Sequence, residues 1–316
     1  TRVCPVCHTP WPSTFTADSP LIGLVGVRGS GKTIMLSVLA QELTTSIQRR
    51  FDAAIHPTGN RRLVSQLANW RSDMGRGGHL PSQTETYQHV SKDQRDSAEP
   101  AVFEWQLADG RNRQRSTIFS FYDTAGEDLA SMDRTRELNY LAATDGVILL
   151  LDPFGFTGNH DLARSKGVDE DLLHDRPEDV LRNIVELLRQ ADQVGSKKKI
   201  SRPLAVVVSK IDAFFDSIDE DSPLRRPSSD QPYFDEAESL EVHEHVAMLL
   251  DEWSGGGLLR MLELNFSTFR LFAASALGAE PDYARRTANP RGVLPHRVAE
   301  PLLWLMARRG FLPKEG

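Results

Sequence analysis

The eight residues GVRGSGKT, at positions 26–33, constrain the fold of this chain more than any other stretch. They fit the pattern G-x-x-x-x-G-K-[ST], and they lie between the apolar run LIGLVGV at 21–27 and a segment with helical spacing at 31–49. The glycines allow backbone angles that aim successive N–H groups at phosphate oxygens, and the positive end of the following helix attracts the same anions. The stretch therefore predicts a strand, a phosphate-binding loop and a helix in succession.

Strand-like and helix-like segments alternate along the rest of the chain. Further strands are expected at 101–108, 116–123, 145–152, 203–210 and 269–277, and further helices at 60–74, 177–193, 239–253 and 296–310. The polar stretch 109–115 indicates a hairpin, so one strand should be antiparallel. Continuous apolar runs are typical of parallel strands that are covered on both faces. We expect a three-layer α/β fold of the P-loop NTPase type, with a mostly parallel central sheet, one antiparallel strand and helical insertions.

The 316-residue length suits one large domain or two modest ones. Residues 1–19 are polar and proline-rich and indicate an N-terminal appendage, which leaves 20–316 as the main domain, with insertions near 50–98, 153–176 and 214–262. The net charge of −7 provides no strongly basic footprint for a nucleic acid. The apolar runs are far shorter than the roughly 20 residues that span a bilayer. With two cysteines and no signal peptide or lipidation motif, the expected location is cytoplasmic.

The loop and one further segment fit a nucleotide's phosphates and its metal. Lys32 would bridge the terminal phosphates, and the Thr33 hydroxyl would ligate Mg²⁺. Asp123 ends the apolar run FSFYD, where a carboxylate is costly unless it serves a metal, so we expect it to hold Mg²⁺ through water. Gly126 could present its N–H to a terminal phosphate. The alternative is an ordinary strand-end aspartate followed by a glycine turn.

The segment VVVSKIDAF, at 206–214, is the candidate for reading the base. Its apolar strand delivers Ser209, Lys210 and Asp212 to the strand's carboxyl end, where ligands bind in open α/β sheets. The Asp212 carboxylate can accept from the ring N–H and the amino group of guanine, a pair of donors that adenine lacks. The Lys210 stem can pack on the purine face. The alternative is a strand-to-helix turn with solvated charges.

The motifs GxxxxGKT, DTAG, SKID and SA, in this order, resemble those of the translation-factor-related GTPases, the superclass that includes the Ras-like small GTPases. The resemblance covers about residues 21–280 and implies that the cofactors are GTP or GDP and Mg²⁺. In AASAL, at 273–277, backbone N–H groups would bind the guanine keto oxygen. The length of the insertions is similar to that of larger bacterial GTPases of conflict or signalling systems. The implied nucleotide contacts are Gly26, Arg28, Gly29, Ser30, Gly31, Lys32, Thr33, Ile34, Gly126, Ser209, Lys210, Asp212, Ser275, Ala276 and Leu277.

The same superclass uses a switch threonine that contributes to Mg²⁺ in the triphosphate state. The stretch HLPSQTETYQ offers Thr84 and Thr86, and we favour Thr84 as metal ligand and catalytic residue. The alternative is a plain loop rich in serine and threonine.

Three departures from the superclass bear on catalysis or on guanine affinity, and we assign catalysis to Lys32, Glu127, Arg28 and Thr84. Glu127 replaces the glutamine that orients water, so unaided hydrolysis should be slow. At the position of Arg28, a small residue usually leaves room for an arginine supplied by a partner protein. The Arg28 side chain would block that arginine, supply the positive charge itself, or face solvent. Ser209 replaces the usual asparagine and has a shorter reach, which should reduce guanine affinity.

The cysteines Cys4 and Cys7, in CPVCH, have the spacing of a zinc knuckle. A closed zinc site needs four ligands, so the pair would be half of a ribbon whose first knuckle lies upstream. The alternative is a plain reduced pair.

These features together predict a GTP-binding molecular switch with slow, Mg²⁺-dependent hydrolysis of GTP and a protein effector or regulator. One alternative is a non-hydrolysing, GTP-bound scaffold that docks protein partners. A second is a P-loop ATPase or kinase, against which the guanine motif argues.

Overall fold

The computed structural model describes residues 19–26, 29–58, 62–76, 78–80, 101–109, 113–123, 141–173 and 176–315. Seven strands among them form one sheet, in the order β2-β3-β4-β1-β5-β6-β8. Their bounds are β1 (Leu21–Gly26), β2 (Ala53–Thr58), β3 (Ala101–Asp109), β4 (Arg113–Asp123), β5 (Gly146–Leu151), β6 (Leu204–Val208) and β8 (Phe269–Ala273). β3 is antiparallel to both of its neighbours, whereas β4, β1, β5, β6 and β8 are mutually parallel. The predicted mostly parallel sheet with one antiparallel strand is confirmed.

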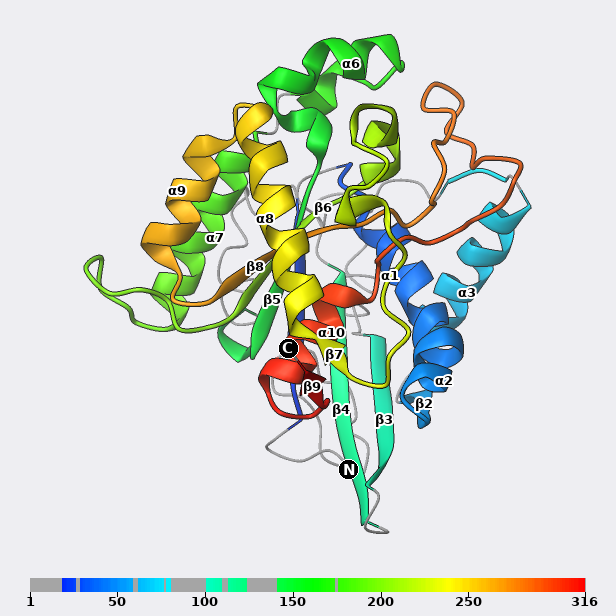
Figure 1. Cartoon of the computed structure of the whole chain (residues 1–316), viewed down its shortest axis with the longest axis vertical. Helices are drawn as coiled ribbons and strands as arrows, with labels where there is room; N and C mark the ends of the chain where they lie inside the picture. Colours follow the sequence, from blue (N-terminus) through cyan, green and yellow to red (C-terminus); the bar gives the residue numbers. More distant parts are fainter. Residues whose placement is uncertain are drawn as a thin grey trace, which may run out of the picture.

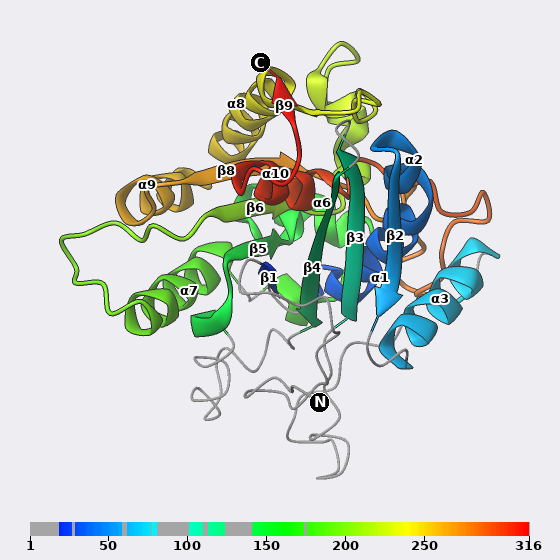
Figure 2. The same ribbon diagram turned by 90° about the horizontal axis from the view of Figure 1, so that it is seen from below.

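Helices pack on both faces of this sheet (Figures 1 and 2). The longer ones are α1 (Lys32–Glu42), α3 (Arg62–Gly75), α7 (Pro177–Ala191), α8 (Glu236–Glu252), α9 (Gly256–Asn265) and α10 (Glu300–Arg308). Shorter elements are η1 (Leu43–Ile47), α2 (Gln48–Arg50), η3 (Pro153–Gly155), η4 (Thr157–Asn159), α6 (His160–Ser165), η5 (Glu170–Leu173), η6 (Ile211–Ser217), η7 (Pro223–Arg225) and a two-stranded pair, β7 (Phe234–Asp235) with β9 (Lys314–Glu315). The helices predicted from spacing are confirmed, with ends shifted by a few residues.

The residues of β5 show how the sheet separates two apolar cores. Ile148 and Leu150 belong to the core that α1 and α10 cover, whereas Val147, Leu149 and Leu151 belong to the core beneath α7, α8 and α9. Successive side chains of a strand point to opposite faces, so a strand that is covered on both must be apolar throughout. All six residues of β5 are buried. The apolar runs therefore correspond to the central strands of a three-layer α/β/α fold.

β2 and α9 are two of the elements that lie where the sequence predicted none. β2 pairs only with β3, at the edge of the sheet, and it contains Pro57. A proline lacks the N–H that a central strand must donate, but an edge strand can contain one. The proline therefore hid the strand from prediction by sequence. α9 opens with Gly256 and Gly257, residues that usually indicate a turn.

No helix in the described ranges is both long and apolar enough to cross a bilayer. Several residues singled out in the sequence lie outside the described residues, so their roles stay predictions: Cys4, Cys7, Arg28, Thr84, Thr86, Gly126 and Glu127.

Candidate nucleotide-binding site

The candidate phosphate-binding loop lies between the end of β1, at Gly26, and the start of α1, at Lys32, as its motif predicted. Gly29 and Gly31 have φ angles of +76° and +85°, a region that side chains other than glycine's rarely adopt. At Gly26, an added Cβ would meet the Leu150 carbonyl oxygen of β5 at 2.6 Å. These glycines are therefore required by the backbone path and by close packing.

Lys32, the first residue of α1, turns back over this loop. Its side chain is buried, and the ammonium donates a hydrogen bond to the Gly26 carbonyl at 2.9 Å. Ser30 is also buried, and Thr33 and Ile34 follow in the first turn of the helix. The ammonium is thus held against the loop that it is expected to serve.

Asp123 is the last residue of β4, as the sequence predicted. Its backbone lies in register with Leu24 of β1, two residues before Gly26, where the phosphate-binding loop begins. The strand-end position beside the loop is the one that a metal-binding carboxylate needs, and the Mg²⁺ role stays a prediction.

The SKID segment follows β6 directly. The Ser209 hydroxyl donates to the Leu151 carbonyl at 3.0 Å and so links the end of β6 to the end of β5. Lys210 adopts a left-handed conformation, with φ of +53°. Its ammonium lies 2.6 Å from a carboxylate oxygen of the buried Asp152 and 5.5 Å from the centre of the Phe154 ring. The lysine stem is therefore fixed beside an aromatic ring.

Asp212 and Ser275 come together from two neighbouring strand ends. Asp212 lies in the first turn of η6, after β6, and Ser275 follows β8. Burial raises the pKa of the Asp212 carboxyl, and a hydrogen bond from the Ser275 hydroxyl acts in the opposite direction. The two motifs that the sequence assigned to one base thus form a single cluster.

The loop after Ser275 is tightly closed. The Ser275 N–H donates to the His296 carbonyl at 2.9 Å, and the Leu294 N–H donates to the Leu277 carbonyl at the same distance. The Gly278 N–H donates to the Ser275 hydroxyl at 2.8 Å. Ala276 and Leu277 are therefore held in one backbone conformation beside Asp212.

Sequence reasoning missed Asp152 as a member of this cluster. It directly follows β5, where its other carboxylate oxygen accepts from the Phe154 N–H at 3.1 Å. The signal was available, because a carboxylate at the end of an apolar strand was the same pattern that singled out Asp123. Tyr283, which contacts Phe154 edge-on, carried no comparable signal.

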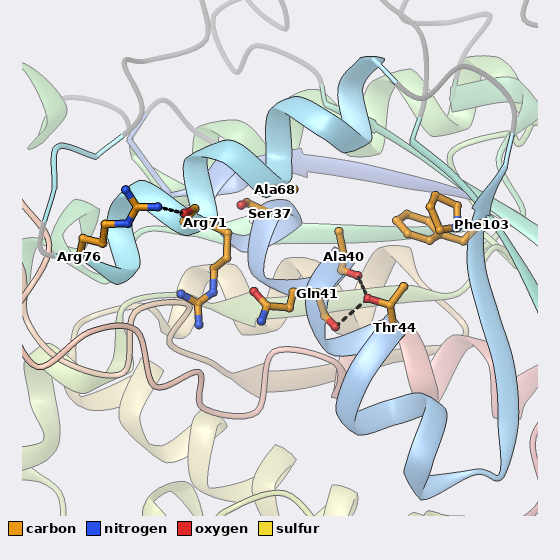
Figure 3. Close-up of a pocket in the computed structure, with 10 residues that line it drawn as sticks. Ser37, Ala40, Gln41, Thr44, Ala68, Arg71, Arg76 and Phe103 are labelled. Carbon is orange, nitrogen blue, oxygen red and sulfur yellow. Dashed lines mark hydrogen bonds between the residues drawn. The ribbon is translucent and has the colours of Figure 1, made fainter.

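A separate cavity of about 620 Å³ lies between α1, α3 and the β2–β3 edge. Figure 3 shows Arg71 of α3 and Gln41 of α1 among the side chains that line it. The Arg76 guanidinium donates to the Ser72 hydroxyl at 2.9 Å. The Arg71 guanidinium also donates to the Val293 carbonyl at 3.2 Å. The cavity is lined by Ser37, Ala40, Gln41, Thr44, Pro57, Ala68, Arg71, Ser72, Arg76 and Phe103.

Within the ranges that the structure describes, no group of three or more His, Cys, Asp or Glu side chains is arranged so that it could hold a metal ion. The predicted cysteine ligands lie outside those ranges.

No protein-family profile matches the sequence, and a search of curated proteins finds no match either. Solved structures do match. One comes from the signal recognition particle receptor SRb-GTP/SRX complex of Chaetomium thermophilum, with 15% identity over 86% of this chain and 96% of that chain, and a TM-score of 0.36. Another is the Ski7 GTPase-like domain of S. cerevisiae bound to GTP, with 14% identity over 83% of this chain and 44% of that chain, and a TM-score of 0.37. A third is Roco2 RocCORdC of Methanosarcina barkeri bound to GDP, with 12% identity, coverage of 84% and 46%, and a TM-score of 0.30.

All three likenesses have low identity and TM-scores below 0.5, so the functional conclusion depends on the residues of the site. Those residues follow adjacent parallel strands: the phosphate-binding loop follows β1, Asp152 follows β5, the SKID segment follows β6 and Ser275 follows β8. The carboxyl ends of parallel strands form one edge of a sheet, which is where α/β folds bind ligands.

Proposed function

We propose that the protein is a guanine-nucleotide-binding switch that hydrolyses GTP slowly with Mg²⁺. The observation that carries the proposal is the pairing of Asp212 with Ser275, at the same sheet edge as the glycine-rich loop that ends in Lys32. A carboxylate and a phosphate-binding loop on one edge match the two ends of a guanine nucleotide.

The base would be read by hydrogen bonds from two loops. The Asp212 carboxylate accepts from the guanine ring N–H and from one hydrogen of the 2-amino group. Because the Ser275 N–H already donates to the His296 carbonyl, the keto oxygen falls to the N–H groups of Ala276 and Leu277. The Ser209 hydroxyl is bonded to the Leu151 carbonyl, which leaves Asp212 as the principal selector in SKID.

The phosphates would lie against the loop and the first turn of α1. Backbone N–H groups at a helix N-terminus attract anions, and the Lys32 ammonium is already positioned over the loop. Thr33, Asp123 and Thr84 are the proposed Mg²⁺ ligands, and the ion supplies charge neutralisation at the terminal phosphates. Glu127 and Arg28 are the proposed groups for orienting water and for charge stabilisation.

Titration with GTP, GDP and ATP in the presence of Mg²⁺ tests the binding proposal. We expect GTP and GDP to bind and ATP to bind at least about 100-fold more weakly, because adenine offers no donor pair to Asp212. Tighter binding of ATP would instead support an ATPase or kinase.

Multiple-turnover phosphate release, with and without candidate protein partners, separates the switch from a non-hydrolysing scaffold. We expect slow release from the protein alone, because the Glu127 charge opposes the charge that develops on the transferred phosphate. GTP that binds but is never turned over, even with a partner present, would favour the scaffold, in which the insertions dock protein partners.

A further inference from the structure

Tyr283 lies in a turn of the segment that follows the Ser275–Leu277 loop, and backbone hydrogen bonds hold this turn. Asp282 and Thr287 exchange backbone hydrogen bonds of 3.0 and 3.2 Å around this turn. The Arg285 N–H donates to the Asp282 carboxylate at 2.8 Å. The position of the Tyr283 side chain is therefore set by the backbone on both sides of it.

The Tyr283 ring belongs to the aromatic cluster beside Lys210. It meets the Phe154 ring edge-on, with 5.6 Å between centres and 87° between planes. The Lys210 ammonium lies over the same Phe154 ring. Tyr283 and the lysine of SKID thus share one aromatic neighbour.

The Tyr283 hydroxyl is enclosed, and within the described part of the chain it has no hydrogen-bond partner. Burial raises the pKa of the phenol, and the nearby carboxylates of Asp212, Glu280 and Asp152 raise it further. The group is therefore neutral at physiological pH and can accept a hydrogen bond as well as donate one. Enclosed polar groups without a partner are rare in folded proteins, and a ligand or a water molecule can complete their bonding.

Asp212 is the first of the carboxylates whose charge acts on the Tyr283 phenol, and this proximity indicates which ligand atom would complete the bonding. Asp212 can accept only one of the two hydrogens on the guanine 2-amino group, since its other oxygen accepts from the ring N–H. We propose that the Tyr283 hydroxyl accepts the second hydrogen of that amino group, which makes Tyr283 a specificity-determining residue for purines with a 2-amino substituent. This inference rests on the proposed guanine-nucleotide function and names a further residue of the same site.

The test compares GTP with ITP, whose base differs from guanine only in lacking the 2-amino group. Tyr283→Phe removes the hydroxyl and keeps the ring on Phe154. Calorimetric titration should show GTP affinity reduced about five- to tenfold, the usual size of one hydrogen bond. ITP affinity should change less than about twofold, since ITP has no hydrogen to donate there.

A matched variant and a stability measurement distinguish this role from a structural one. Tyr233→Phe, next to β7, removes the same group elsewhere and should change neither affinity. Tyr283→Phe should leave the melting temperature of the nucleotide-free protein unchanged or raise it, because the hydroxyl that it removes has no partner among the described residues.

An equal loss for GTP and ITP, or no loss for GTP, would overturn the role of Tyr283 while leaving guanine binding intact. A wild-type protein that binds neither nucleotide would overturn the proposed function itself.

Discussion

The Lys210 ammonium and the Asp152 carboxylate lie 2.6 Å apart and join the loops that follow β6 and β5. The Asp152 side chain is 4% exposed, so little water competes for the lysine. Its second oxygen accepts from the Phe154 N–H and so positions the ring next to Lys210. Asp152 thus acts on the proposed base site through the lysine that it holds.

Asp152→Asn should weaken GTP binding about tenfold, because the lysine loses a charged partner while the bond to the Phe154 N–H is kept. The preference for GTP over ATP should not change, since Asp212 is untouched. Titration with both nucleotides measures this. Asp161→Asn on α6, where the carboxylate is fully exposed, is the control. A changed base preference in Asp152→Asn would show that Asp152 contacts the base itself.

Gly278→Ala should destabilise the protein far more than Gly310→Ala. Both glycines have a φ of +70°, so each alanine incurs the cost of a left-handed conformation, about 1–2 kcal/mol. At Gly278 the new Cβ would also overlap the Leu294 carbonyl oxygen, whereas at Gly310 nothing lies within 4 Å. We expect a total loss of about 2–5 kcal/mol for Gly278→Ala, measured by urea unfolding. Equal losses would mean that the loop after Ser275 is not packed as described.

Burial raises the pKa of Glu42, at the end of α1, to about 7, with Arg71 opposing the rise and Glu300 adding to it. Between pH 4.5 and 7 the unfolded chain has lost this proton while the folded protein keeps it. Stability must therefore fall as pH rises through that window. The glutamine of Glu42→Gln cannot ionise, so this variant should lack the fall in unfolding free energy with pH. At pH 7.5 it should be more stable than the wild type by on the order of 2 kcal/mol.

Melting temperatures from pH 4.5 to 8 measure this effect. The difference between Glu42→Gln and the wild type should shrink towards pH 4.5, and the exposed Glu252→Gln should follow the wild type throughout. A wild-type stability that rises across the window in step with the variant would contradict the raised pKa.

The phosphate-binding loop and the central strands could be predicted because their causes are local. Gly29 and Gly31 are needed by the backbone itself, and β5 is apolar because both of its faces are covered. The convergence of Asp212 and Ser275 followed from a resemblance in motif order, and the structure brings the two residues together.

The remaining features depend on contacts between distant segments. β2 is recognisable as a strand only next to β3, because its own sequence contains a proline. Tyr283 reaches Phe154 only because the chain after Ser275 folds back to pair at His296. Neither the spacing nor the composition of the sequence indicates that the segment after Ser275 folds back in this way. The contact between Tyr283 and Phe154 could therefore not be predicted.

Selection of guanine by Asp212 is tested by titrating wild-type and Asp212→Asn protein with GTP and XTP. Xanthine carries a keto group where guanine has its 2-amino group, so an amide side chain suits it and a carboxylate does not. We predict that the wild type prefers GTP over XTP by about 100-fold or more and that Asp212→Asn reverses this preference. If Asp212→Asn still prefers GTP, or if the wild type does not discriminate between GTP and XTP, Asp212 does not read the base.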